Sequence, residues 1–108
     1  MKGINRMNNH NYTIEFVKGD RADIISQFKK MDSYCLLNNL FKVKTIITSK
    51  KDYYDGFNEM VSYIGQRKDM TIHIVAPSKA SLIQSDEARN KLVTLYKQQR
   101  IIVHFLEK

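Results

Sequence analysis

The run TIHIVA, residues 71–76, ends at Pro77, the only proline of the chain, and has the composition of a buried β-strand. Three further runs have the same character: YTIEFV (residues 12–17), VKTIIT (residues 43–48) and IIVHFL (residues 101–106). The segments between them are longer, and their apolar residues recur every three or four positions, as in amphipathic helices. Strands that alternate with helices predict an α/β domain built on one sheet.

The helical segments have recognisable beginnings. A turn signal follows the first strand, and Asp20 is the expected cap of the first helix. The apolar stripe of this helix continues to about Phe41, with an expected interruption near Asp32. The second helix is expected within residues 50–66, and the third begins at Ser85, where a serine precedes two acidic residues.

The predicted order is therefore β-α-β-α-β-α-β in one small domain. Right-handed crossovers make the four-stranded sheet mostly parallel and place helices on both of its faces. Residues 71–76 and 101–106 are nearly all apolar, which favours central positions in the sheet. Residues 78–84 are expected to form a polar loop, residues 1–11 a flexible lead-in, and residues 12–108 the single α/β domain.

One other fold competes with this interpretation. Residues 33–48 can also be read as a short helix that leads into further helices, as in a winged-helix-like α+β domain. The helical pattern between the last two strands argues against a terminal β-wing, and so favours the α/β fold.

Composition limits the class of protein. A chain of 108 residues with 43% hydrophobic and 27% charged residues is ordinary for a globular domain. No apolar run approaches the roughly 20 residues of a membrane-spanning helix. Cys35 is the single cysteine and cannot form an internal disulfide, so a cytoplasmic protein is the default expectation. An open sheet also leaves two edges, which favours a homodimer, although the sequence does not indicate which edge pairs.

The charge balance favours a polyanionic partner. Eighteen Lys and Arg against 11 Asp and Glu give a net charge of +7, and such an excess suits nucleic acid, DNA or RNA. On the predicted topology, the amino-terminal edge of the sheet gathers six cations against one acid, a net +5. The six candidate nucleic-acid-binding residues are Lys42, Lys44, Arg67, Lys68, Lys97 and Arg100. The same cations also suit the negative ends of the helix dipoles, which is a purely structural explanation.

The opposite edge of the sheet is a second candidate for phosphate binding. Ligands of open α/β sheets usually bind at the carboxyl ends of the strands, where helix amino termini offer N–H groups. Five cations meet three acids at this edge, a net +2. The candidate phosphate-binding residues are Lys18, Arg21, Ser49, Lys50, Lys51 and Lys79.

No group of residues carries a catalytic signature. His73 and His104 lie in strands that a simple crossover places side by side, but a third metal ligand is missing from both strands. Cys35 lies in an apolar helical stripe and is expected to be a buried, unreactive thiol. The four glycines are too dispersed for a phosphate-binding loop. We therefore predict no enzyme activity, catalytic residues, metal or cofactor.

Two functions follow as hypotheses. The first is a non-enzymatic nucleic-acid-binding accessory or regulatory protein that binds through lysine and arginine contacts to phosphates. The alternative is a small protein-interaction or inhibitory module that docks on an acidic surface of a larger partner, with Tyr53, Tyr54 and Phe57 as candidate anchors. At least two of these three aromatic residues are expected to pack in the core.

Overall fold

A computed structural model describes residues 11–19 and 22–107 and confirms the α/β fold. Its strands are β1 (Asn11–Lys18), β2 (Leu40–Thr48), β3 (Ile72–Ala76) and β4 (Ile101–Phe105). Its helices are α2 (Ile24–Leu37), α3 (Tyr53–Gly65), the single-turn α4 (Lys79–Leu82) and α5 (Asp86–Gln98). Asn11, assigned to the lead-in by its polarity, begins β1; the rest of that segment, residues 1–10, lies outside the described residues.

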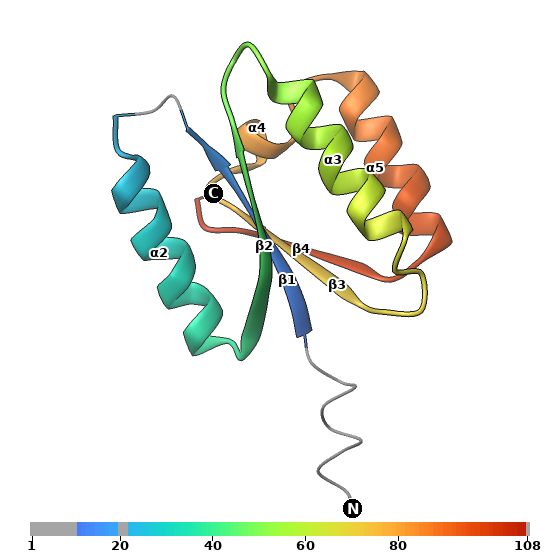
Figure 1. Cartoon of the computed structure of the whole chain (residues 1–108), viewed down its shortest axis with the longest axis horizontal. Helices are drawn as coiled ribbons and strands as arrows, with labels where there is room; N and C mark the ends of the chain where they lie inside the picture. Colours follow the sequence, from blue (N-terminus) through green and yellow to red (C-terminus); the bar gives the residue numbers. More distant parts are fainter. Residues whose placement is uncertain (1–10, 20–21, 108) are drawn as a thin grey trace, which may run out of the picture.

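The sheet is four-stranded and wholly parallel, with the order β2-β1-β3-β4. The chain moves from β1 outward to β2, then crosses back over β1 to β3 and continues to β4. α2 lies on one face of the sheet, and α3 and α5 lie side by side on the other (Figure 1). This placement is what the preference for right-handed crossovers predicts, because the chain reverses its direction across the sheet after β2. An all-parallel sheet rules out the winged-helix-like alternative.

The prediction of central positions was right for β3 and wrong for β4, which is an edge strand. The apolar composition of β4 does not reflect burial on both faces, because Ile102 and Phe105 remain 37% and 36% exposed. The second central strand is β1, although it contains Glu15. β1 is central because the chain passes back over it from β2 to β3. The amino-acid composition of a single strand does not indicate such a path.

Several element boundaries differ from the sequence pattern. Helix α2 runs without interruption through Asp32 and ends at Leu37, and Phe41 belongs to β2. Asn39 reverses the chain between them with a φ of 56°, a conformation that asparagine tolerates better than most residues. The N-cap of α2 is Asp23, and Asp20 lies outside the described residues.

The expected loop at residues 78–84 contains α4. This single turn begins at Ser78, whose side chain accepts a hydrogen bond from the Ser81 amide while the Ser81 hydroxyl accepts one from the Ser78 amide. Such a reciprocal cap stabilises a short turn that has little apolar periodicity.

The main core lies between the sheet and the pair α3 and α5. Phe16 of β1 meets Tyr53 and Phe57 of α3 edge-on, with ring centroids 6.1 and 6.4 Å apart. Gly56 allows α3 to lie directly on β2, because a Cβ atom there would meet the side chains of Thr48 and Ile46. A smaller core under α2 contains Val17, Met31, Cys35 and Val75. Within the described chain, no helix has the length and apolar character needed to span a membrane.

Candidate nucleic-acid interface

The loops that precede β3 and β4 lie together at the amino-terminal edge of the sheet. The buried side chain of Gln99 donates a hydrogen bond to the Arg67 carbonyl at 3.2 Å. The Ile72 amide donates to the Arg100 carbonyl at 3.1 Å. The first bond connects the loop after α3 to the end of α5, and the second joins the starts of β3 and β4. The segments that carry four of the six predicted cations therefore lie together. We call Arg67, Lys68, Lys97 and Arg100 the basic edge cluster.

The basic edge cluster has little charge compensation. Within residues 11–19 and 22–107, none of its four side chains is in an ion pair. The Arg67 guanidinium lies over the Tyr63 ring, 3.5 Å from its centroid, and donates to the Tyr63 carbonyl at 2.9 Å. The other three cations are exposed, and so is Tyr96, at 66%. Asp69, which follows Arg67 and Lys68 in the loop before β3, is an exposed acid next to the cluster in the sequence.

The remaining two predicted cations have carboxylate partners. A β-bulge pairs Lys42 with Thr13 but Lys44 with Ile14, so the two lysines point to opposite faces of the sheet. Lys42 lies 3.0 Å from Asp32, on the α2 side. Lys44 lies 2.9 Å from Glu59 of α3, with its ammonium group 5.3 Å from the Tyr63 ring centroid. Lys44 therefore borders the basic edge cluster with its charge compensated, and Lys42 is separate from it.

At the carboxyl-terminal edge, the described residues place an acid at the start of α3. The Ser49 amide and hydroxyl both donate to the Asp52 carboxylate, which places a negative charge at the start of α3 and lowers the pKa of Asp52. The Gln27 side chain accepts a hydrogen bond from the Lys18 amide and donates one to the Lys18 carbonyl. The recess between α2 and the loop after β4 is only about 10 Å³, too small for a phosphate group. Lys50, Lys51 and Lys79 are exposed, and Arg21 lies outside the described residues.

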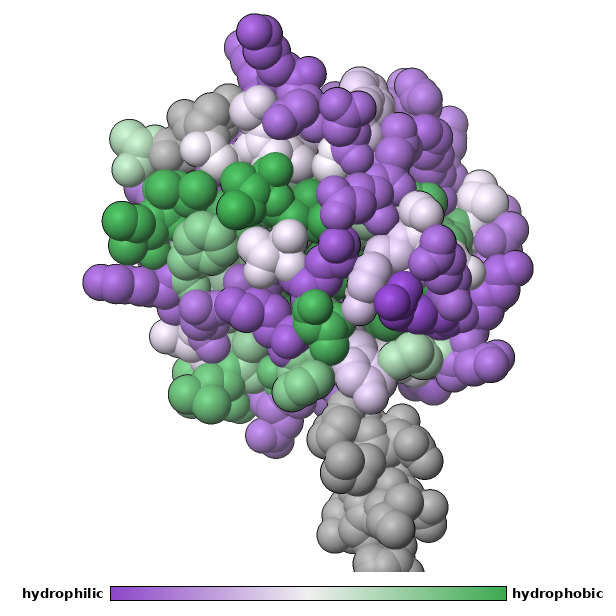
Figure 2. Space-filling model, viewed as in Figure 1, coloured by the Kyte–Doolittle hydropathy of each residue, from purple (hydrophilic) through white to green (hydrophobic). Residues whose placement is uncertain are grey.

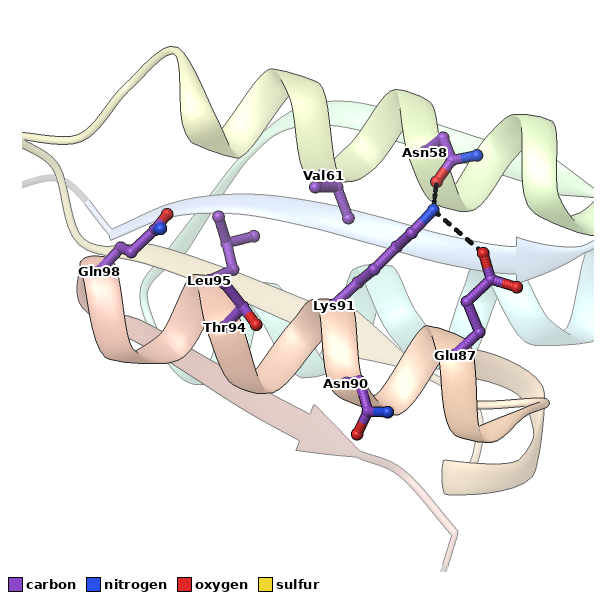
Figure 3. A pocket seen from close by; sticks show the side chains of 8 residues that line it. All are labelled: Asn58, Val61, Glu87, Asn90, Lys91, Thr94, Leu95 and Gln98. Atoms are coloured by element: carbon purple, nitrogen blue, oxygen red, sulfur yellow. Dashed lines mark hydrogen bonds and ion pairs between the residues drawn. The ribbon is translucent and has the colours of Figure 1, made fainter.

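A wider groove of about 690 Å³ separates α3 and α5. Figure 3 shows Val61 and Leu95 facing each other across it, with polar side chains along its rims. Its cation, Lys91, extends across the groove to Asn58 at 2.8 Å and lies 3.6 Å from Glu87. Because this lysine is already compensated, the groove offers an anion much less than the basic edge cluster does.

A polar cluster that the sequence pattern does not predict is buried under α2. Glu15 of β1 is fully buried; it accepts a hydrogen bond from the Cys35 thiol at 3.6 Å and lies 3.7 Å from Lys42. Burial, together with hydrogen bonding to Asp32, raises the pKa of Glu15 to about 7. Burial and the Glu15 charge raise the pKa of Cys35 to about 12, so this thiol is a poor nucleophile. The only signal in the sequence is a glutamate inside an apolar strand.

The two histidines meet as the topology predicted. His73 Nδ1 lies 2.9 Å from His104 Nε2, and the other nitrogen of His104 lies 2.7 Å from the Tyr34 hydroxyl. Burial lowers the pKa of both imidazoles, and for His73 the neighbouring His104 adds to this effect. The described residues contain no group of three side chains able to hold a metal ion. The arrangement thus stabilises a neutral, hydrogen-bonded pair beneath α2.

The three candidate aromatic anchors are divided as expected. Tyr53 and Phe57 are buried in the core, and Tyr54 is 42% exposed, with its hydroxyl bonded to Ser85. Among the described residues, the two most exposed large apolar side chains are Leu36 and Leu37 at the end of α2, which are 80% and 82% exposed, and Phe41 of β2 is 53% exposed. Figure 2 shows apolar side chains gathered over the α2 half of the molecule, whereas the α3 and α5 half is mostly hydrophilic.

Comparison with protein-family models, with curated proteins and with solved structures finds no match to this chain. Its function must therefore be inferred from its own surface chemistry.

Proposed function

We propose that this protein binds nucleic acid, without catalysis, through the basic edge cluster. The observation that carries the proposal is the joining of two basic loops by the Gln99–Arg67 and Ile72–Arg100 hydrogen bonds. Four cations are thereby held at one edge of a folded sheet. Cations on a preformed surface neutralise phosphates and release condensed counterions, which is the main source of such affinity. The exposed ring of Tyr96 adds a face on which a base can stack.

Salt dependence tests this proposal directly. Fluorescence anisotropy with labelled single-stranded and duplex DNA and RNA, titrated over a salt series, measures the number of phosphate contacts. Replacing both Lys68 and Lys97 with glutamine removes two positive charges from the cluster, and should reduce the slope of log K against log salt by about 2. Arg67 is left intact because it also packs on Tyr63.

The matched control is the replacement of Lys51 and Lys79 with glutamine. These exposed lysines lie at the opposite edge of the sheet, so the control removes the same charge from another place. It should leave the slope nearly unchanged. Equal losses in both double variants would mean that only the net charge matters, and an absence of binding at low salt would refute the proposal.

A second candidate function is a protein-interaction module for an acidic partner, and the exposed apolar residues near the end of α2 favour it. Leu36 and Leu37 are about four-fifths exposed, on a helix that also carries the exposed Lys29 and Lys30. Such a surface suits an apolar anchor surrounded by cations. Affinity capture after nuclease treatment should recover a stoichiometric acidic protein with the native chain and lose it with Leu36→Ser/Leu37→Ser. Recovery that is unchanged by this substitution would exclude the surface.

A further inference from the structure

The two edges of the sheet differ in how they are protected. β2 carries a β-bulge and two lysines, and both features discourage pairing with another strand. β4 reads IIVHF, without a charge, a proline or a bulge, and its register with β3 is regular from Ile101 to Phe105. Within the described residues, β4 pairs only with β3. Its outer side is therefore an unprotected edge.

The hydrogen bonds to β3 identify the backbone groups that remain on the outer side. The Arg100 carbonyl accepts from Ile72, and the Leu106 amide donates to the Ala76 carbonyl. In a parallel strand, the N–H and C=O of one residue point the same way and alternate along the chain. Ile101, Val103 and Phe105 thus direct their donors and acceptors outward.

An apolar groove of about 170 Å³ lies beside this edge, between α5 and β4. Val93 and Tyr96 of α5 are 45% and 66% exposed along it, and Val103 lies at its base. Side chains of a strand added next to β4 would cover this groove. The edge therefore offers both backbone hydrogen bonds and apolar area to the same partner.

We propose that the partner is a second copy of this chain, which pairs β4 with β4 in an antiparallel direction about a two-fold axis near Val103. The charges at the two ends of β4 favour a second copy in the antiparallel orientation. Arg100 precedes β4 and Glu107 follows it, both are exposed, and neither has an ion-pair partner in the described part of the chain. Antiparallel pairing brings Arg100 of each copy near Glu107 of the other. A two-fold interface of this kind is self-complementary and closes.

The dimer would contain one continuous eight-stranded sheet. Around Val103, the Phe105 side chain of one copy lies opposite Ile101 of the other, on the face that carries the apolar groove. This inference does not require nucleic-acid binding, because it rests on the outward backbone groups of β4 and on the pairing of Arg100 with Glu107. Arg100 is the one member of the basic edge cluster that it uses.

Molar mass in solution tests the proposal. Light scattering after size exclusion, over a range of concentrations, should give twice the chain mass of 12.7 kDa for the native protein. Val103→Pro removes one outward N–H and leaves the bonds to β3 in place, so it should give the monomer. Ile102→Lys adds a charge to the edge without changing the backbone. It occurs twice in the dimer, so a tenfold effect per site raises the dissociation constant about a hundredfold.

The matched control is Ile47→Lys, which places the same charge on the other edge strand, where Ile47 is 55% exposed. It should remain dimeric. Circular dichroism shows which variants fold, and if Val103→Pro does not fold, Ile102→Lys decides the question. A native protein that is monomeric at its highest soluble concentration overturns the proposal. So does a dimer that persists unchanged in Ile102→Lys.

Discussion

The two faces of the sheet bury different kinds of side chain. Under α3 and α5, the central strands contribute apolar side chains, and Ile14, Phe16 and Ile74 among them are fully buried. Under α2, the same strand contributes Glu15, and β3 and β4 contribute a pair of histidines. The long helices α3 and α5 and the single turn α4 pack on the first face, and α2 packs on the second. The difference teaches that apolar packing is enough to stabilise one layer. The stability of the other layer also depends on the protonation states of Glu15 and the two histidines.

Removing one of the two large phenylalanine side chains that are fully buried on the apolar face should have the largest effect. Phe57 is fully buried and contacts Phe16 and Tyr53. Phe57→Ala should lower the free energy of unfolding by about 3–5 kcal/mol, because it removes buried area and leaves a cavity. Urea denaturation measures this change. Tyr54→Ala, on the exposed side of the same helix, should cost less than about 1 kcal/mol. Similar losses in the two variants would contradict the assignment of the core to this face.

The polar face should make the free energy of unfolding depend on pH. The pKa of Glu15 is raised from 4.5 to about 7, so ionisation of this carboxyl disfavours the folded state. Stability should therefore fall as pH rises from about 4.5 to about 7, by about 3 kcal/mol. Glu15→Gln should be more stable than the native protein at pH 8 by about that amount, and equally stable near pH 4.

The difference between the two unfolding curves reports Glu15 together with Asp32 and Cys35, whose pKa values depend on it. The lowered pKa values of His73 and His104 act in the opposite direction, since they destabilise the fold as pH falls below about 6.5. Both proteins contain these histidines, so their effect cancels in the difference. Glu59→Gln, on the other face and 57% exposed, should change stability by less than about 1 kcal/mol at any pH. A flat difference curve for Glu15→Gln would show that the carboxyl is solvated.

The two helical glycines of α3 offer a sharper test of the close contact between α3 and β2. A Cβ atom at Gly56 would overlap the Thr48 side chain, whereas nothing lies within 4 Å of one at Gly65. Gly56→Ala should lose about 1–3 kcal/mol through overpacking. Gly65→Ala should gain up to about 1 kcal/mol from helix propensity. Thermal unfolding of both variants measures the contrast, and a gain in both would mean that α3 lies farther from the sheet.

The smallest expected effect concerns the hydrogen bond over the histidine pair. Tyr34→Phe removes the hydroxyl that lies 2.7 Å from His104, and should cost about 1 kcal/mol. Tyr96→Phe removes an exposed hydroxyl and should cost almost nothing. Chemical denaturation at pH 8, where both imidazoles are neutral, makes the comparison. Equal stability of the two variants would remove Tyr34 from the buried network.

Much of this architecture was predictable from local pattern. The four strands and three long helices follow from apolar period, and the adjacency of His73 and His104 follows from a right-handed crossover. The strand order was only partly predictable. β4 has the apolar composition that is typical of a central strand, but it lies at the edge of the sheet. The turn α4 was missed because a serine cap stabilises it without apolar periodicity.

The candidate site shows the same limit. Charge counting selected six cations, and the fold brings four of them together. Lys42 and Lys44 are two residues apart and would share a face of a regular strand, but the bulge at β2 separates them and each meets a carboxylate. A bulge depends on pairing with a neighbouring strand, so periodicity within β2 alone could not reveal it.

The sequence by itself determined the alternation of strands and helices, the burial of Cys35 and the excess of positive charge, because each is a local or additive property. Only the tertiary structure decided which strand lies at the edge, which cations remain uncompensated and which carboxyl is buried. These are relations between distant segments: Glu15 meets Cys35 and Lys42 only after α2 folds onto the sheet. Desolvation and ion pairing act through space, so their outcome depends on the assembled layers.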